Sequence, residues 1–292
     1  MLERVAIYSS GSGAKTDEVI LKLINDLCRK GIRIQLYERV GTETFCPGVR
    51  TIEKFKDLKE LSGVPDLVIS VGGDGTFLET MMQVKELGIP VAGINTGRLG
   101  FLANISEDEI SNSLDLLFRG EFGVIERSLL QVERPVDLFG SGSSVALNEI
   151  TIQKTNPSMI TVNVFVDDIY LNTYWSDGLI ISTATGSTAY NLSVGGPILS
   201  PEDESMIISP ISPHNLTIRP IVVSGKCRLK MVIEGRSKDF LVTCDFRSQR
   251  IPVSSEVVIS RYPGKLKTVM LKGRDFYSTL RNKLMWGADK RN

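Results

Sequence analysis

The chain has few of the residues on which metal centres, disulfide scaffolds and catalytic triads are built. Among 292 residues it has one histidine and four cysteines. Cys28, Cys46, Cys227 and Cys244 lie far apart with no paired spacing, which disfavours a zinc site or a disulfide framework. His214 has no Gly-x-Ser-x-Gly turn or reactive-cysteine setting to work with, so a hydrolase is not expected.

The chain also lacks excess charge and long apolar runs. Lys and Arg total 34, as do Asp and Glu, so there is no global positive field to hold nucleic acid or an anionic membrane. No apolar run approaches the roughly 18 residues of a membrane helix, and the first residues carry no signal-peptide core. With 42% hydrophobic residues the chain can bury a full core. We expect a cytoplasmic protein of one large or two smaller domains.

A strand–helix–strand pattern in the first half predicts a parallel sheet. Residues 4–9 are typical of a strand, 16–30 carry apolar residues at helical spacing, and 32–36 alternate as the next strand. Further buried strands are expected at 67–71 and 89–94. Because neighbouring parallel strands end at one edge, we expect the loops that follow them to lie side by side.

The run 67–71 stops on Gly72-Gly73-Asp74-Gly75-Thr76. At this edge of a sheet glycines let phosphates approach backbone N–H groups near a helix N-terminus. A carboxylate beside a polyphosphate would repel it unless it orients or deprotonates an attacking hydroxyl. The motif therefore predicts a phosphate cradle in which Asp74 acts on the acceptor. The alternative is a tight turn in which Asp74 caps the following helix.

A second glycine-containing loop, residues 95–102, follows the next strand and should lie beside the first. Within it Arg98 would offer positive charge to phosphates. The alternative is a surface arginine paired with an acid.

The second half of the chain has a different pattern. Beyond about residue 124 helical periodicity fades, and short β-type runs separated by turn residues take over. We therefore expect an α/β nucleotide-binding domain from residues 1–124 with 263–292, and a β-rich, sandwich-like domain from 125–262. Asp167-Asp168 is expected to form a hairpin turn. The amphipathic segment 276–284 is expected to pack back against the first domain as a helix.

An amide and an acid, Asn148 and Glu149, stand side by side within the apolar strand pattern 145–152. Since side chains alternate along a strand, one of the two must face the core or a ligand. The alternative is a strand end or bulge at this position.

Residues 177–197 combine an opening acid with a density of hydroxyls and glycines that few structural needs require. Thr188, Tyr190 and Ser193 could supply hydrogen-bond donors and a stacking ring for a base and ribose. The alternative is a short helix with Ser187 as its N-cap.

Together, Gly72–Thr76, Asn148-Glu149 and Asp177–Pro197 resemble, in order and spacing, the motifs of the NAD kinase (ATP-NAD kinase) family of bacterial type. The resemblance runs from the first strand nearly to the last helix. It implies a Rossmann-like α/β domain followed by a β-rich domain. The implied activity is ATP-dependent phosphorylation of the 2′-hydroxyl of the adenosine ribose of NAD, which gives NADP.

The resemblance also implies roles for individual residues. Asp74 would be the general base, while a divalent ion on ATP, Mg²⁺ in our expectation, and the glycine-rich backbone hold the phosphates. Asn148 and Glu149 would hold NAD through adenine and ribose contacts, and Asp177 would face the nicotinamide end. The phosphate-holding positions are Gly72, Gly73, Gly75 and Thr76. The residues of the adenosine pocket are Thr188, Ala189, Tyr190 and Ser193.

The chain departs from the common family pattern at two places. Ala184 stands where many members have proline, which changes loop stiffness. Asp245-Phe246-Arg247 stands where many have Asp-Gly-Gln, so Asp245 and Arg247 are left out of the expected site.

Two other functions compete with NAD phosphorylation. A diacylglycerol-type lipid kinase shares Gly-Gly-Asp-Gly-Thr but needs an apolar groove or membrane-facing patch, and no basic amphipathic helix supplies one. A regulatory NAD-binding module without turnover would have no use for the charge of Asp74. By resemblance we also expect a homodimer or homotetramer assembled through the β-rich domain.

Overall fold

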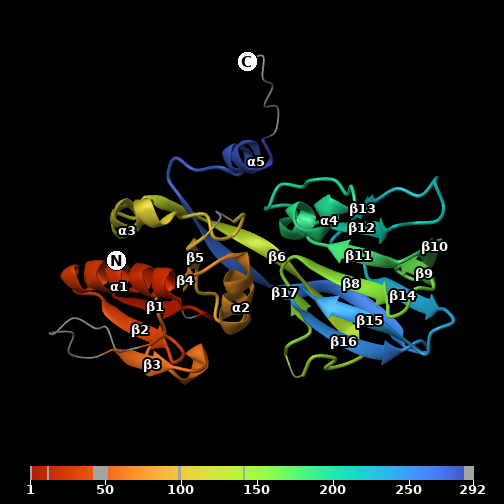
Figure 1. Ribbon diagram of the computed structural model, residues 1–292, viewed down its shortest axis with the longest axis horizontal. Helices are drawn as coiled ribbons and strands as arrows, with labels where there is room; N and C mark the ends of the chain where they lie inside the picture. Colours follow the sequence, from red (N-terminus) through yellow and green to blue (C-terminus); the bar gives the residue numbers. More distant parts are fainter. Residues whose placement is uncertain (1, 12, 42–51, 98–99, 141, 286–292) are drawn as a thin grey trace, which may run out of the picture. The chain divides into compact units, whose positions relative to one another are not determined.

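A computed structural model describes residues 2–11, 13–41, 52–97, 100–140 and 142–285 (Figure 1). The chain forms two compact units, which are described separately. Unit 1 comprises Met1–Glu126 and Leu266–Asn292, and unit 2 comprises Arg127–Lys265. The domain roles expected from sequence, nucleotide binding for 1–124 with 263–292 and NAD binding with oligomerisation for 125–262, stay predictions.

Unit 1 is built on a parallel sheet with strand order β5-β4-β1-β2-β3. The strands are β1 (Arg4–Tyr8), β2 (Arg33–Tyr37), β3 (Glu53–Phe55), β4 (Leu67–Val71) and β5 (Val91–Ile94). Every residue of β4 is buried, as its β-branched run predicts. The strand–helix–strand expectation for the first half is therefore confirmed, and Asp74 stands directly beyond the end of a central strand.

Unit 1 also contains helices, which Figure 1 labels. They are α1 (Ala14–Arg29), α2 (Asp74–Val84), α3 (Ile110–Phe118) and α5 (Phe276–Leu284), with short 3-10 turns η1 (Leu58–Glu60) and η2 (Glu107–Glu109). The buried face of α1 has the helical spacing read from the sequence, and Gly31 ends the turn after it at φ +72°. The C-terminal helix α5 belongs to unit 1, as expected.

Unit 2 is a β-rich sandwich with one short helix, α4 (Tyr190–Ser193), and a 3-10 turn, η3 (Thr185–Thr188). One antiparallel sheet has the order β13-β12-β11-β8-β15-β16, and the strands β10-β9-β14-β17 belong to the other sheet, in which β6 pairs with β17 and β7 pairs with β6. The strands are β6 (Phe122–Arg134), β7 (Val145–Ala146), β8 (Glu149–Lys154), β9 (Ile160–Val166), β10 (Ile169–Ser176), β11 (Gly178–Ser182), β12 (Met206–Ile211), β13 (Ile221–Val223), β14 (Leu229–Glu234), β15 (Asp239–Cys244), β16 (Arg247–Pro252) and β17 (Glu256–Leu271).

The two sheets of unit 2 share one apolar core. Phe240 and Ile152 from one sheet and Leu229 from the other are fully buried in the same cluster. The β9–β10 hairpin turns at Asp167 and Asp168, both with positive φ, as their sequence predicts.

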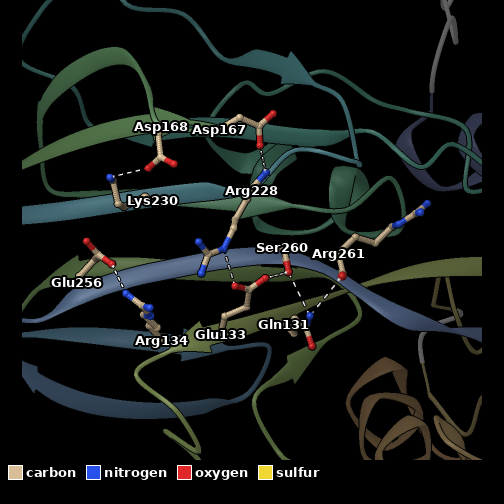
Figure 2. A network of polar contacts seen from close by, with 10 residues as sticks. All are labelled: Gln131, Glu133, Arg134, Asp167, Asp168, Arg228, Lys230, Glu256, Ser260 and Arg261. Carbon is tan, nitrogen blue, oxygen red and sulfur yellow. Dashed lines mark hydrogen bonds and ion pairs between the residues drawn. The ribbon is translucent and has the colours of Figure 1, made fainter.

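The face of β6 away from this core carries a chain of polar contacts (Figure 2). Glu133 accepts from Arg228 Nε at 2.6 Å and from Ser260 Oγ at 2.5 Å, and Gln131 Nε2 donates to Ser260 Oγ at 3.1 Å. Leu130 and Val132 point into the core from the other face. The polar contacts therefore tie β6 to β17 and to Arg228, which directly precedes β14, without using core residues.

Strand β5 packs so closely against the loop that follows it that Gly93 has no room for a side chain, and a substitution there tests this packing. A Cβ on Gly93 would lie 2.7 Å from Ala103 Cα and 2.9 Å from Leu102 O, both backbone atoms that cannot rotate away. We predict that Gly93→Ala lowers the free energy of unfolding by about 1–3 kcal/mol, measured by urea denaturation. The control Gly123→Ala, where a Cβ meets nothing within 4 Å, should stay within about 0.5 kcal/mol of wild type. Equal midpoints for both variants would contradict this packing.

Candidate active site

Asp74 is the first residue of α2, and its carboxylate is held by a neighbouring loop. Phe101 N–H donates to Oδ2 at 2.9 Å, and the N–H groups of Leu102 and Ala103 donate to Oδ1 at 3.1 and 2.9 Å. Gly73 is the N-cap of α2, and in the described part of the chain the Asp74 carboxylate makes no bond to its own helix. The alternative that Asp74 merely caps its helix is therefore wrong.

This loop leaves the Asp74 carboxylate with little freedom. A carboxylate has about four acceptor positions, and three are taken by N–H groups, two of them on Oδ1. Gly100 packs so closely that a Cβ there would lie 1.7 Å from Oδ1. The half-buried carboxylate is thus a fixed acceptor with one position left on Oδ2, which suits a single hydroxyl donor.

The glycines before and after Asp74 shape an open backbone. Gly72 has φ +153°, and a Cβ there would lie 2.4 Å from Thr76 Oγ1, so the position requires glycine. Gly73 and Gly75 are exposed, and a Cβ on either would meet nothing within 4 Å. A ligand can therefore approach this backbone closely.

The ends of neighbouring strands converge here, as their parallel order predicts. Thr76 Oγ1 lies 3.1 Å from Ser10 Oγ, which follows β1, and Thr16 Oγ1 lies 3.3 Å from Thr96 Oγ1, which follows β5. Arg98 lies outside the described residues, so its expected contact with phosphates stays a prediction.

In unit 2 the structure brings Asn148 and Glu149 against the loop that follows β11. Glu149 begins β8 and pairs with Ser182, while Asn148 lies at a break between β7 and β8. The expected continuous strand is thus interrupted, and the strand-end alternative describes the backbone here. Thr183 N–H donates to the Asn148 carbonyl at 2.9 Å, and a Cβ on Gly186 would lie 2.1 Å from that oxygen.

Asp245 holds this break in the way that the 101–103 loop holds Asp74. Its carboxylate accepts from the backbone N–H groups of Leu147 and Asn148 at 2.8 Å and of Glu149 at 3.2 Å. The residue lies in the β15–β16 turn at φ +52°, a conformation that Asp tolerates. Asp245 therefore fixes the backbone of the Asn148-Glu149 pair.

Asp245, Arg247 and Arg127 are not among the site residues expected from the sequence. Arg247 donates to the carbonyls of Ser143 and Val145, on the segment leading to the pair. Arg127 is buried, and its Nη1 donates to Thr185 Oγ1 at 3.1 Å. The hairpin-turn position of Asp245 was a usable signal. No sequence pattern marks Arg127.

Burial gives Glu149 an unusual charge state. Burial first, and the charge of Asp245 second, raise the pKa of Glu149 to about 8, against the opposing effect of the Tyr190 N–H. Burial also raises the pKa of Asp245, but three N–H donors and Arg247 favour its ionised form. With its pKa raised to about 8, Glu149 holds a proton at neutral pH that it can donate to a ligand.

The expected adenosine-pocket residues form the turn beside Glu149. Thr188 Oγ1 donates to the Thr185 carbonyl at 3.2 Å, and Ala189 is the N-cap of α4. The Tyr190 hydroxyl accepts from Gln153 Nε2 at 3.4 Å, so its ring runs along β8. Ser193 is exposed at the end of α4.

The structure contradicts the alternative in which Ser187 is the N-cap of this short helix. Its buried hydroxyl donates to the Ala184 carbonyl at 2.6 Å and accepts from Leu199 N–H at 3.0 Å. Ser187 therefore connects the turn that begins at Ala184 to the segment around Leu199.

Asp177 lies away from these residues. It directly precedes β11, whose far end pairs with Glu149, so the two acids are separated by roughly 16 Å along the strand. Asp177 forms an ion pair with Lys154 at 2.5 Å and lines a cavity of about 460 Å³ with His214. His214 is exposed in a bend of the chain.

The clamp by Asp245 can be tested with a matched pair of variants. In Asp245→Asn an amide replaces one acceptor oxygen, so one buried N–H of residues 147–149 loses its partner. We predict a loss of about 1–3 kcal/mol in unfolding free energy, measured by urea denaturation. The control Asp137→Asn shares the positive φ but is exposed, and it should change stability by less than about 0.5 kcal/mol. A control as damaging as Asp245→Asn would show that backbone strain, not the clamp, is responsible.

The raised pKa of Glu149 predicts a pH dependence of stability. Between its ordinary value of 4.5 and about 8, folded Glu149 keeps a proton that the unfolded chain has released. The unfolding free energy should therefore fall as pH rises through this window, by at most about 1.4 kcal/mol per unit, and level off above it. Urea midpoints from pH 5 to 9 measure this slope. Glu149→Gln should flatten it, the exposed Glu202→Gln should not, and an unchanged slope in Glu149→Gln would contradict the assignment.

Known proteins resemble this chain over nearly its whole length. The family described as ATP-NAD kinase N-terminal domain matches residues 30–122, and the one described as ATP-NAD kinase C-terminal domain matches 147–271. An NAD kinase of Christiangramia forsetii is 40% identical over 99% of this chain and 100% of its own. An NAD kinase of Cytophaga hutchinsonii is 45% identical over 79% of each chain.

Solved structures share the fold. The yeast NADH kinase complexed with NADH has a TM-score of 0.86 at 22% identity, over 99% of this chain and 89% of that one, which shows the fold alone. An NAD kinase from Archaeoglobus fulgidus in complex with ATP has a TM-score of 0.75 at 26% identity, over 97% and 98% of the chains. The α/β unit followed by a β-rich unit is thus the architecture of these kinases. On the family matches and the relatives together, this chain belongs to the NAD kinase family.

Proposed function

We propose that this protein transfers the γ-phosphoryl group of ATP to the 2′-hydroxyl of the adenosine ribose of NAD, giving NADP and ADP, with Asp74 as general base. Membership of the family and the NAD kinase relatives support the reaction. The observation that carries the residue assignment is the Asp74 carboxylate, fixed by three N–H donors with one acceptor position left.

The geometry suits an acid that orients the acceptor. Phosphoryl transfer passes through a loose transition state, so the position of the attacking hydroxyl matters as much as removal of its proton. The open position on Oδ2 would accept the 2′-hydroxyl and receive its proton as the bond to phosphorus forms. The exposed backbone of Gly73 and Gly75, at the N-terminus of α2, would hold phosphate oxygens beside it, with Gly72 and Thr76 shaping the turn.

The NAD-holding residues follow from the cluster in unit 2. We assign Asn148, protonated Glu149 and the turn Thr188–Tyr190 to the adenosine half, with Ser193 at its edge. A neutral Glu149 can donate a hydrogen bond without repelling the anionic dinucleotide. Asp177, beside the cavity at the other end of β11, is assigned to the nicotinamide end.

Magnesium is the divalent ion that we assign to the reaction. Within the described ranges no three histidine, cysteine or acidic side chains gather in a way that could hold a metal. That fits an ion brought to the site on the phosphates of ATP, where Mg²⁺ keeps most of its ligands from substrate and water. Bound there, it supplies charge neutralisation for the β- and γ-phosphates.

The competing functions have less support. A lipid kinase is not favoured, because the relatives are NAD kinases. No helix in the described residues is long and apolar enough to cross a membrane. A binding module without turnover would have no need for an Asp74 carboxylate that three N–H groups fix in place. The cytoplasmic location stays a prediction. The homo-oligomer also stays a prediction, and it is supported by three exposed apolar side chains on edge strand β10, Ile169, Tyr170 and Trp175.

The proposed base is tested by Asp74→Asn. We predict that kcat for NADP formation from NAD and ATP falls by about 10²–10⁴-fold, because the amide cannot take the proton, while NAD affinity changes little. A coupled assay with an NADP-specific dehydrogenase measures turnover, and calorimetry measures binding. The exposed Asp108→Asn, also near a helix start, should match wild type.

The other outcomes are equally informative. A folded wild type that binds NAD without turnover would indicate the regulatory module. A wild type that does not bind NAD would require a test of diacylglycerol as acceptor. Full activity in Asp74→Asn would refute the base assignment.

A further inference from the structure

The C-terminal helix α5 brings a lysine to the loop that holds Asp74. Asp275 caps the helix, accepting from Ser278 N–H at 2.8 Å, and Leu280 is its buried residue, 2% exposed. Lys283 lies one turn after Leu280 on the same side, and it is half-buried. Arg281 is two residues earlier, about 200° around the helix from Lys283, and is exposed. The partly buried side of α5, which faces the rest of unit 1, thus carries the cation of Lys283.

Lys283 contacts the residue that donates to the catalytic carboxylate. Its Nζ lies 4.7 Å from the centroid of the Phe101 ring, a cation–π distance. The backbone N–H of this same Phe101 donates to Asp74 Oδ2 at 2.9 Å, the oxygen with the open acceptor position. One residue therefore touches both the ammonium and the carboxylate.

The two charges also act on each other. Burial lowers the pKa of Lys283, and the negative charge of Asp74 opposes that shift. An acid that must stand beside polyphosphate suffers repulsion, which a nearby cation in a partly desolvated site offsets more strongly than it would in water. Lys283 is placed to do this without taking the open position on Oδ2.

We propose that Lys283 is a positioning residue for phosphoryl transfer: seated on Phe101, it anchors the loop that orients Asp74 and balances the charge of Asp74 beside the anionic donor. The proposal rests on the proposed kinase function and adds to it a role for α5. Lys283 acts through Asp74 and Phe101, so its removal should slow the chemical step and leave binding of NAD unaffected.

The experiment compares three variants of the full chain in the coupled NADP assay. Lys283→Met keeps the length of the side chain and removes the charge, and we expect kcat to fall about 10–100-fold with KM for NAD within about twofold of wild type. Lys283→Arg keeps a cation that can stack on Phe101, and it should stay within about fivefold of wild type. Arg281→Met, on the far side of the same helix, should match wild type.

Thermal melting checks that each variant is folded. If Lys283→Met is unfolded, Lys283→Gln takes its place, and added methylammonium should restore part of its kcat. A charge-free variant with wild-type kcat would overturn the proposal. So would Lys283→Arg as slow as Lys283→Met, a defect confined to KM, or no rescue by methylammonium. Absence of turnover in wild type would overturn the proposed function and this proposal with it, whereas the preceding results leave the proposed function standing.

Discussion

Three backbone N–H groups donating to one carboxylate are the interaction on which this site depends. They turn Asp74 from a mobile acid on a glycine-rich turn into a fixed acceptor with a single open position. Gly93 has no room for a Cβ because the loop that makes these bonds passes too close, and Gly100 has none because a Cβ there would meet the Asp74 carboxylate. The chemistry proposed for Asp74, the packing of β5 and the contact of α5 with Phe101 all rely on this loop staying in place.

Unit 2 also has a carboxylate that accepts three backbone N–H groups, but there the carboxylate fixes the backbone. Asp245 takes three consecutive N–H groups at the break before β8 and so fixes Asn148 and Glu149. Burial, with the nearby Asp245 carboxyl, raises the pKa of Glu149 to about 8 and leaves it protonated at neutral pH. Two carboxyl groups close together thus take two roles, one that fixes the backbone and one that is neutral and available to a ligand, because their hydrogen-bond donors differ.

Local pattern was enough to predict much of the fold. The apolar spacing of residues 16–30 predicted the buried face of α1, and Asp167-Asp168 predicted a tight hairpin, because period and turn chemistry act between near neighbours. The contacts that define the site join residues far apart in the chain. The hydrogen bonds from residues 101–103 to Asp74 and the contact of Lys283 with Phe101 leave no periodic pattern in the sequence. The family resemblance identified Asp74 as a site residue, but it did not indicate which groups fix its carboxylate.

A crystal structure with NAD and a non-hydrolysable ATP analogue bound would test the role of Asp74 most directly. The geometry predicts the 2′-oxygen of the adenosine ribose at hydrogen-bond distance, about 2.7 Å, from Asp74 Oδ2, with the three N–H bonds from residues 101–103 retained. A 2′-oxygen bonded to another group, or an Asp74 carboxylate that has left this loop when both substrates are bound, would contradict it.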